Sequence, residues 1–347
     1  MKGLLSFSGV VTKVRAMQGR FFDEEDFREI VSLPDVPAVA AYLKKNPNYE
    51  EALKAVDERT LHRGQLEYYL RNTILRDFQK IYCFSDSQQR KFLKRYGRRY
   101  EVRYLKSILV PIMEGGQTAE ESRLFDLHFS RYSDLDMEKL SQARTITEFV
   151  EALKGSPYYE PMARVHDTSP QATLFEYETA LDLFHFSTIW KDKKEIAGKP
   201  GEEALKEFYG TKFDMLNLWY IYRAKKYYNM DNVSVYALTI PVLYHLNKND
   251  IRRLVEAESD NDFGTALKET YYGRIYPALA PDNLQYMYTK ICRDVIKEGA
   301  DKDPYSIASL YQYLYLKEHE VYRLTTALEC VRYGLKPEES IRYVMQR

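Results

Sequence analysis

Three aspartates that recur at a fixed spacing are the first residues of this sequence whose type and position could do chemistry. Each lies 17 residues before a Leu-Lys dipeptide: Asp26 before Leu43-Lys44, Asp136 before Leu153-Lys154, and Asp250 before Leu267-Lys268. Carboxylates that converge in a fold can act as general acids and bases. The same residues suit helix capping, because each follows by three residues a side chain that accepts hydrogen bonds: Asp23, Ser133 or Asn247. We favour capping and predict no catalytic residue at these positions.

The recurrence predicts three copies of one helical unit. A second helix start lies eight residues before the repeated leucine, at Asp35, Thr145 and Ser259. The pattern then breaks at three similar segments, Asn46–Tyr49, Ser156–Tyr159 and Thr270–Gly273. Longer helical stretches follow and end in a motif with an acid before apolar residues at helical spacing: Glu101-Val102, Asp214-Met215 and Glu320-Val321. The repeated residues therefore read as caps and packing stripes.

The same patterns predict the fold class and the domains. No segment alternates with period two for long enough to form a sheet, and Pro and Gly fall between the helical stretches, so we predict an all-α protein. The copies are expected at residues 1–116, 117–230 and 231–347, each forming one helical lobe. The lysine-rich insert Lys191–Gly201 is predicted to be an exposed loop inside the second copy.

The remaining candidates for chemistry are histidines and cysteines. The histidines show no metal-ligand spacing: His62, His128, His166, His185, His245 and His319. The three cysteines, Cys83, Cys292 and Cys330, form no CxxC pair. His185 could be a buried general base near Glu176 and Asp182, but a core histidine is the favoured interpretation. We predict no catalytic, cofactor-binding or metal-binding residue, and an enzyme would need a pocket that joins those three side chains.

Basic residues gather in one segment although the chain as a whole is neutral, with 51 Lys+Arg against 51 Asp+Glu. The segment contains Arg90, Lys91, Lys94, Arg95, Arg98, Arg99, Arg103 and Lys106. It is either a solvated helix face or a docking surface for an acidic partner. Nucleic acid is disfavoured, because no aromatic-interleaved recognition motif accompanies the cluster.

The sequence shows no segment of the length needed to cross a membrane. Its longest apolar stretches, such as Ile108–Met113 and Ala237–Tyr244, fall far short of the ~20 residues that a spanning helix requires. The N-terminus lacks the pattern of a signal peptide. We therefore expect any membrane association to be indirect.

The three copies, preceded by Gly9–Met17, resemble the C subunit of the archaeal and bacterial A/V-type rotary ATPases, the equivalent of the d subunit of the eukaryotic vacuolar ATPase. The resemblance covers essentially the whole chain and is closest from Val14 through Phe27. Members of the family usually have Leu-Leu where this chain has Phe21-Phe22.

The resemblance implies a fold of three helical lobes around a pseudo-threefold axis, forming a funnel. It implies a non-catalytic rotor subunit, a socket between the proteolipid ring of the membrane sector and the D and F subunits of the central stalk. Such a subunit would lie peripherally on the cytoplasmic side of the cell membrane and couple ATP turnover to proton or sodium transport, without a cofactor and without nucleic acid.

Candidate partner-binding residues come from the family-like first helix, to which we assign Arg15 and Arg20, and from the basic cluster, in which we single out Arg95, Arg98 and Arg99. The alternative is a helical scaffold or regulatory solenoid that binds another protein and is unrelated to ATPases. In an open solenoid each copy contacts only its neighbours in sequence. Contact between the first and third copies would therefore separate the two interpretations.

Overall fold

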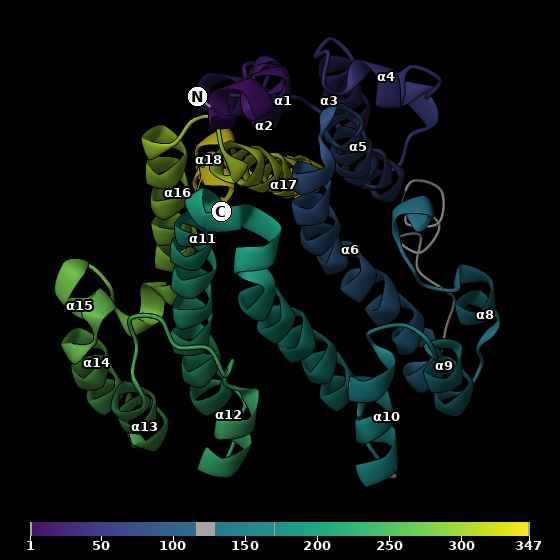
Figure 1. Cartoon of the computed structure of the whole chain (residues 1–347). Helices are drawn as coiled ribbons and strands as arrows, with labels where there is room; N and C mark the ends of the chain where they lie inside the picture. Colours follow the sequence, from purple (N-terminus) through teal and green to yellow (C-terminus); the bar gives the residue numbers. More distant parts are fainter. Residues whose placement is uncertain (1, 116–128, 170, 346–347) are drawn as a thin grey trace. The chain divides into compact units, whose positions relative to one another are not determined.

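The computed structural model describes residues 2–115, 129–169 and 171–345 (Figure 1). Within these ranges the regular elements are helices and no β-strand occurs, which confirms the predicted all-α class. The expected boundary at 116 and 117 and the candidate His128 lie outside the described residues. No helix in the described ranges is long and apolar enough to cross a membrane.

The chain divides into two compact units. The first contains Met1–Lys94, Gln117–Met137 and Asp303–Arg347, and the second contains Arg95–Gly116 and Glu138–Lys302. The two ends of the chain therefore belong to the same unit. The three lobe boundaries expected from the repeats stay a prediction.

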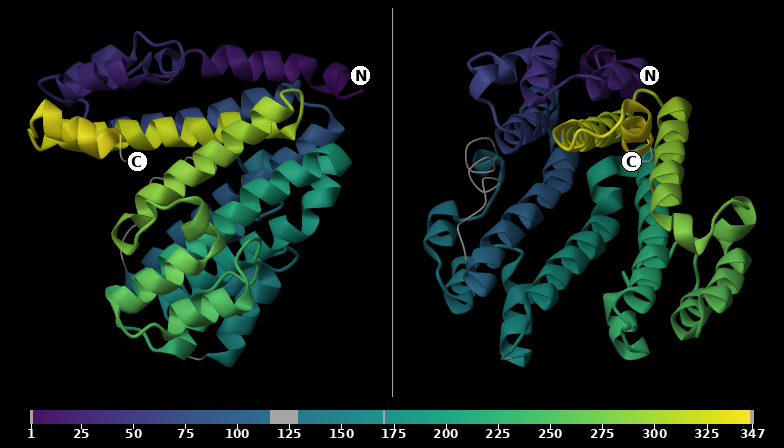
Figure 2. Two further views of the ribbon diagram at one scale, coloured as in Figure 1. Left: turned by 90° about the vertical axis from the view of Figure 1, so that its left-hand side faces the viewer. Right: turned by 180° about the vertical axis from the view of Figure 1, so that it is seen from behind.

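The first unit is built around one long helix from the C-terminal part of the chain. That helix, α17, contacts α1, α2, α3, α5 and α18, and α18 also contacts α2. Figure 2 shows α17 running beside α1. The helices of this unit are α1 (Lys2–Gln18), α2 (Glu24–Val31), α3 (Val36–Leu43), α4 (Glu50–Leu53), η1 (Glu58–Thr60), α5 (Arg63–Phe84), the start of α6 (Ser87–Glu114), η2 (Ser130–Tyr132), α17 (Ile307–Arg332) and α18 (Pro337–Met345).

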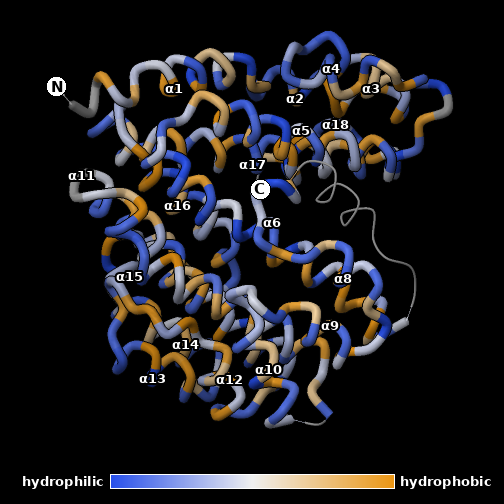
Figure 3. Tube along the Cα trace, turned by 45° about the vertical axis from the view of Figure 1, so that its right-hand side comes forward, coloured by the Kyte–Doolittle hydropathy of each residue, from blue (hydrophilic) through white to orange (hydrophobic). Residues whose placement is uncertain are grey.

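The second unit is organised by α11, which consists of two helices that meet at a kink at Gly198 and which packs against α10, α12, α13 and α16. Apolar and polar residues are interleaved along the helices of this unit, as the hydropathy colours of Figure 3 show. Each helix can therefore bury an apolar face and expose a polar one. Besides the rest of α6, the unit contains α8 (Met137–Gln142), α9 (Ile146–Ala152), α10 (Tyr159–Thr168), α11 (Leu174–Lys226), α12 (Asn232–Leu238), α13 (Lys248–Glu256), α14 (Asp260–Glu269), α15 (Tyr271–Ile275), η3 (Pro281–Asn283) and α16 (Leu284–Lys302).

The predicted helix caps are confirmed in two of the three copies. Asp23 accepts hydrogen bonds from the Glu25 and Asp26 amides at 2.8 and 3.0 Å, and the Asp26 carboxylate accepts one from the Asp23 amide at 2.9 Å. Asn247 and Asp250 form the same reciprocal box on α13. In the second copy the predicted helix start is wrong, because α8 begins at Met137, while Ser133 accepts a hydrogen bond from the Leu135 amide at 3.3 Å. The second starts at Asp35, Thr145 and Ser259 are N-caps as predicted.

The predicted loop at Lys191–Gly201 is wrong, because these residues are part of α11. Helical spacing buries Ile196 and Ala197 on one face, and this burial outweighs the local preference of a lysine-rich Gly-Pro segment for a loop. The break is confined to Gly198, whose φ of 66° lies in the region that favours glycine. The premise that Pro and Gly avoid helix interiors is also wrong, since Pro111 lies inside α6.

A glycine sets how closely α16 approaches α11. A Cβ atom built on Gly299 would lie 2.6 Å from Cε1 and 2.7 Å from Cζ of Phe208, a side chain that is itself only 2% exposed. Since the ring is held in the core, it cannot move aside without disturbing its neighbours. The α11–α16 contact therefore depends on the absence of a side chain at this position.

Replacing Gly299 by Ala should lower the free energy of unfolding by about 1–3 kcal/mol, because it overpacks that contact. The matched control is Gly9→Ala on α1, where a Cβ would meet no atom within 4 Å. The control should be neutral or stabilising by up to ~1 kcal/mol, since Ala is the better helix former. Urea titrations followed by circular dichroism measure both, and equal effects of the two substitutions would contradict the close packing.

Candidate functional site

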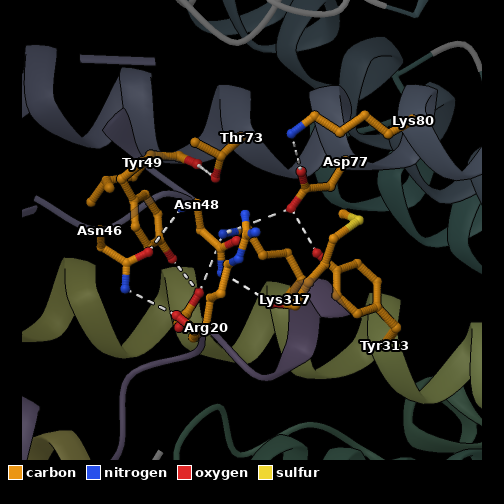
Figure 4. A network of polar contacts seen from close by, with 12 residues as sticks. Arg20, Asn46, Asn48, Tyr49, Thr73, Asp77, Lys80, Tyr313 and Lys317 are labelled. Carbon is orange, nitrogen blue, oxygen red and sulfur yellow. Dashed lines mark hydrogen bonds and ion pairs between the residues drawn. The ribbon is translucent and has the colours of Figure 1, made fainter. Parts of the chain in front are cut away.

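A buried lysine lies at the centre of a polar network in the first unit. The Lys317 side chain on α17 has 0% exposure, and its Nζ lies 3.2 Å from Glu320 Oε2 and 4.0 Å from Asp77 Oδ2 (Figure 4). Asp77 belongs to α5, so the ammonium group bridges two helices that are far apart in sequence. A buried ammonium group is tolerable only when charges and hydrogen bonds replace its water, and the two carboxylates provide that replacement.

Two tyrosine hydroxyls complete the network. Tyr313 donates a hydrogen bond to Asp77 at 2.8 Å, and Tyr49 donates one to Glu320, which also accepts one from the Phe22 amide at 2.8 Å. Burial, and then the neighbouring carboxylate, raises the pKa of Tyr49 and of Tyr313 well above the ordinary value for a phenol. Both hydroxyls therefore stay protonated and act as donors.

Two phenylalanines enclose these groups where the family resemblance led us to expect two leucines. Phe22 stacks on Tyr49 with ring centroids 5.7 Å apart, and Phe21 stacks on Tyr313 at 5.4 Å. Lys317 Nζ lies 4.0 Å from the centroid of the Tyr49 ring, close enough for a cation–π interaction. The aromatic rings exclude water from the network and so strengthen its electrostatic contacts.

The same tyrosine–carboxylate pair occurs twice more in the second unit. Tyr158 donates to Glu101 Oε2 at 2.6 Å, and burial raises the pKa of Tyr158 well above its usual range. Tyr272 donates to Asp214 Oδ2 at 3.0 Å. The Asp214 carboxylate also accepts hydrogen bonds from three successive backbone amides, those of Tyr244, His245 and Leu246, at 3.1, 2.7 and 3.1 Å.

The three pairs connect the sequence copies in cyclic order. Each tyrosine belongs to the break segment of one copy, and each acid belongs to the final helix motif of the preceding copy. Tyr158 of the second copy thus meets Glu101 of the first, and Tyr272 of the third meets Asp214 of the second. Tyr49 of the first copy meets Glu320 of the last, so the order closes on itself.

The sequence contained both halves of this arrangement but not their pairing. The tyrosines and the acids recur at equivalent positions, and we read them as a helix break and as part of a packing stripe. These tyrosines and acids recur next to apolar residues that are expected to be buried. A polar residue that recurs in such surroundings indicates a buried hydrogen-bonded pair. Which tyrosine meets which acid depends on contacts between copies, and these follow only from the tertiary structure.

The candidates for catalysis do not share one pocket lining in the part of the chain that the structure describes. His185 is 8% exposed, and burial lowers its pKa well below the ordinary value, so the imidazole is neutral at pH 7. Glu176 caps α11, where its hydrogen bond from the Thr173 amide at 2.7 Å lowers the carboxyl pKa. Asp182 pairs with Lys106 at 2.7 Å and lines a pocket of about 580 Å³ in the second unit, whose lining includes neither His185 nor Glu176.

Much of the basic cluster on α6 has partners within the protein. Arg95 forms an ion pair with Asp192 at 2.8 Å, and Arg99 donates to the Tyr96 hydroxyl at 2.7 Å and lies over its ring. Arg98 is half-buried, and its charge is close enough to Tyr158 to lower the pKa of that hydroxyl against the effect of burial. Arg90, Lys91 and Lys94 are exposed, and we call these three residues the basic surface.

The arginines assigned to the first helix lie in different surroundings. Arg15 is exposed on α1, with its guanidinium 5.4 Å from the centroid of the Tyr305 ring. Arg20 is also exposed but lies beyond α1, which ends at Gln18, so its assignment to the first helix is wrong. The Arg20 carbonyl accepts a hydrogen bond from the Asn46 side chain at 3.0 Å, which fixes the turn after α1.

The fold and the three pairs define an all-helical repeat protein whose repeated polar residues join one copy to another. A family model described as ATP synthase (C/AC39) subunit matches residues 10–343. The match covers nearly the whole chain, and the protein belongs to this family. The resemblance noted in the sequence is thereby confirmed.

Three relatives are similar to this chain over most of their length. The C subunit of the A-type ATP synthase of Haloquadratum walsbyi is 23% identical over 345 residues, which cover 95% of each chain. The protein of the same name from Methanobrevibacter smithii is 25% identical over 346 residues, 94% of this chain and 85% of the relative. That of Methanocaldococcus jannaschii is 22% identical over 355 residues, 97% of this chain and 85% of the relative.

Exchanging the Asp214 carboxylate for an amide should destabilise the second unit strongly. The Asp214 carboxylate accepts hydrogen bonds from three backbone amides and from the Tyr272 hydroxyl, all of which are donors. In Asp214→Asn an NH₂ group faces some of these donors, which lose their acceptor, so the free energy of unfolding should fall by about 2–4 kcal/mol. Asp250→Asn, which changes a single exposed capping contact, is the matched control and should cost at most ~1 kcal/mol. Thermal unfolding followed by circular dichroism compares them, and a loss at Asp214 no larger than the control would show that the pair carries little stability.

Proposed function

We propose that the protein is a non-catalytic rotor subunit of an A/V-type rotary ATPase, a socket that couples the central stalk to the membrane proteolipid ring. The observation that carries this proposal is family membership over residues 10–343, together with full-length relatives named as C subunits of A-type ATP synthases. The protein takes part in ion transport through the complex. We place it peripherally on the cytoplasmic side of the membrane, in contact with the ring and with the D and F subunits of the stalk.

The physical character of the fold supports a mechanical role. A coupling between two rotating parts must resist twisting, and buried hydrogen bonds that join one copy to another oppose sliding of the helices. The polar residues that recur, Glu101, Asp214 and Glu320, are engaged by tyrosines of another copy. We accordingly propose three lobes arranged as a funnel, without an active site of their own.

The alternative of an open helical solenoid is weakened by the first unit. In an open solenoid the first and last copies lie apart, whereas here α17 and α18 of the last copy contact α1, α2 and α5 of the first. This contact is what a closed arrangement of three lobes requires. A peptide-binding scaffold would be favoured again if the protein bound isolated peptides but no other component of an ATPase.

The proposed role is tested by co-purification. A tagged copy of the protein, expressed in cells that lack the untagged one, should retain the proteolipid ring and the stalk proteins after mild detergent extraction of membranes. ATP hydrolysis by those membranes should drive ion transport only when the protein is present. Recovery of an intact and coupled ATPase complex without this protein would refute the proposal.

The basic surface comprises three exposed residues of the basic cluster, and no ion pair joins them to the described residues. We expect Lys91→Glu/Lys94→Glu to weaken binding to an acidic partner protein at least about tenfold, since charge reversal at an interface replaces attraction by repulsion. The fold should be unchanged, because both side chains are exposed. Arg98 is left unchanged in this test, because its charge lies close to the buried Tyr158 hydroxyl.

The control for this prediction is Lys290→Glu/Lys297→Glu, a double reversal at exposed positions of α16. Pull-down of the complex at two salt concentrations measures both variants, since an electrostatic contact weakens as salt rises. If the α6 and α16 variants retain the complex equally well, the basic surface is only a solvated face.

A further inference from the structure

We propose that the contact of α17 and α18 with α1, α2 and α5, which we call the closing junction, is a separable joint that opens while the second unit remains folded. The closing junction contains the Tyr49–Glu320 pair and the Lys317 network. The proposal concerns the protein by itself and does not rest on its role in an ATPase. It follows from three differences between this junction and those of the other two pairs.

The first difference is covalent. Tyr158 and Glu101 are 57 residues apart in sequence and Tyr272 and Asp214 are 58 apart, whereas Tyr49 and Glu320 are separated by 271 residues. A short run of chain tethers the two sides of each of the first two junctions. The closing junction joins the two ends of the polypeptide, so its sides are held together by non-covalent contacts alone.

The second difference is chemical. The closing junction buries one ammonium group and two carboxylates, those of Lys317, Asp77 and Glu320, all of which regain water when the helices separate. Buried ion pairs recover little of their desolvation cost, so such a contact separates more readily than an apolar contact of equal area. At its rim Arg63 on α5 pairs with Glu329 on α17 at 2.5 Å, with the two side chains 29% and 31% exposed. Interfaces of this polar character are typical of parts that move against each other.

The third difference is in packing. In the second unit α16 approaches α11 through Gly299, which touches the ring of Phe208, and apolar residues such as Leu205, Ile291 and Ile296 are buried on the same two helices. At the closing junction two buried polar atoms of the Arg63–Glu329 pair, Arg63 Nε and Glu329 Oε2, have no hydrogen-bond partner among the described residues. An unsatisfied buried donor destabilises the closed state and gains a partner in water once the joint opens. Both units bury apolar side chains, among them Leu310, Leu314 and Leu324 on α17, and the closing junction buries an ammonium group and two carboxylates in addition.

Hydrogen–deuterium exchange of the full-length chain tests the joint with three matched variants. Tyr49→Phe, Tyr158→Phe and Tyr272→Phe each remove one hydroxyl from one buried pair and leave the ring in place. We expect Tyr49→Phe to speed exchange in α1–α5 and α17–α18 at least about tenfold, because a buried carboxylate loses a donor. Peptides from α11 to α16 should exchange at wild-type rates.

The other two variants are the controls, and they should leave exchange at the closing junction unchanged. The proposal is overturned if Tyr49→Phe speeds exchange uniformly through both units, because the protein would then open only by global unfolding. It is also overturned if each of the three variants loosens its own junction to the same extent, since the closing junction would then have no special role.

A second measurement needs no variant and covers the case in which Tyr49→Phe fails to fold. Exchange of the wild-type protein is followed in low concentrations of urea, below its unfolding transition. Amides of α1–α5 and α17–α18 should share one opening reaction with an equilibrium constant larger than that of the second unit. A single opening reaction common to the whole chain would refute the joint.

Discussion

A hydrogen bond from a buried tyrosine to a buried carboxylate is the interaction on which the rest of this structure depends. It occurs three times, with Glu101, Asp214 and Glu320 as acceptors, and each time it joins residues of two copies. Leaving such an acid without its donor would cost the desolvation of a charge, so each pair fixes the helices that carry it. The short helices of one copy are thereby held on the long helix of another. The compact units of the structure therefore do not coincide with the three sequence copies.

The three pairs have the same geometry but different surroundings. Asp214 is held by three backbone amides as well as by Tyr272, which makes it part of the backbone framework of the second unit. Glu320 accepts a hydrogen bond from one backbone amide, that of Phe22, and otherwise lies beside Lys317, whose second neighbour is Asp77 on α5. An acid held by three backbone amides is tied to the backbone more firmly than one held mainly by side chains, which can exchange those partners for water. One repeated motif can therefore give both a permanent and a separable connection.

The protein with this architecture belongs to the ATP synthase (C/AC39) subunit family. The mechanical coupling that we propose for the protein needs rigidity within each part. Close packing at Gly299 and the amide cage of Asp214 supply this rigidity. The charged contact between α5 and α17 belongs instead to the closing junction, which we propose to be separable. Close packing and buried charge thus occur at different junctions of one repeated architecture.

The sequence by itself determined the all-α class, the repeat, most helix caps and the family, because each depends on residues near one another in the chain or on the pattern as a whole. It did not determine the pairing of Tyr49 with Glu320 across 271 residues, since equivalent tyrosines and acids are locally indistinguishable. It also misjudged Lys191–Gly201, where burial of Ile196 outweighs the preference of a Gly-Pro segment for a loop. Burial and contacts between copies arise from the tertiary structure, and only that structure decided which repeated polar residues meet and which junction carries the charge.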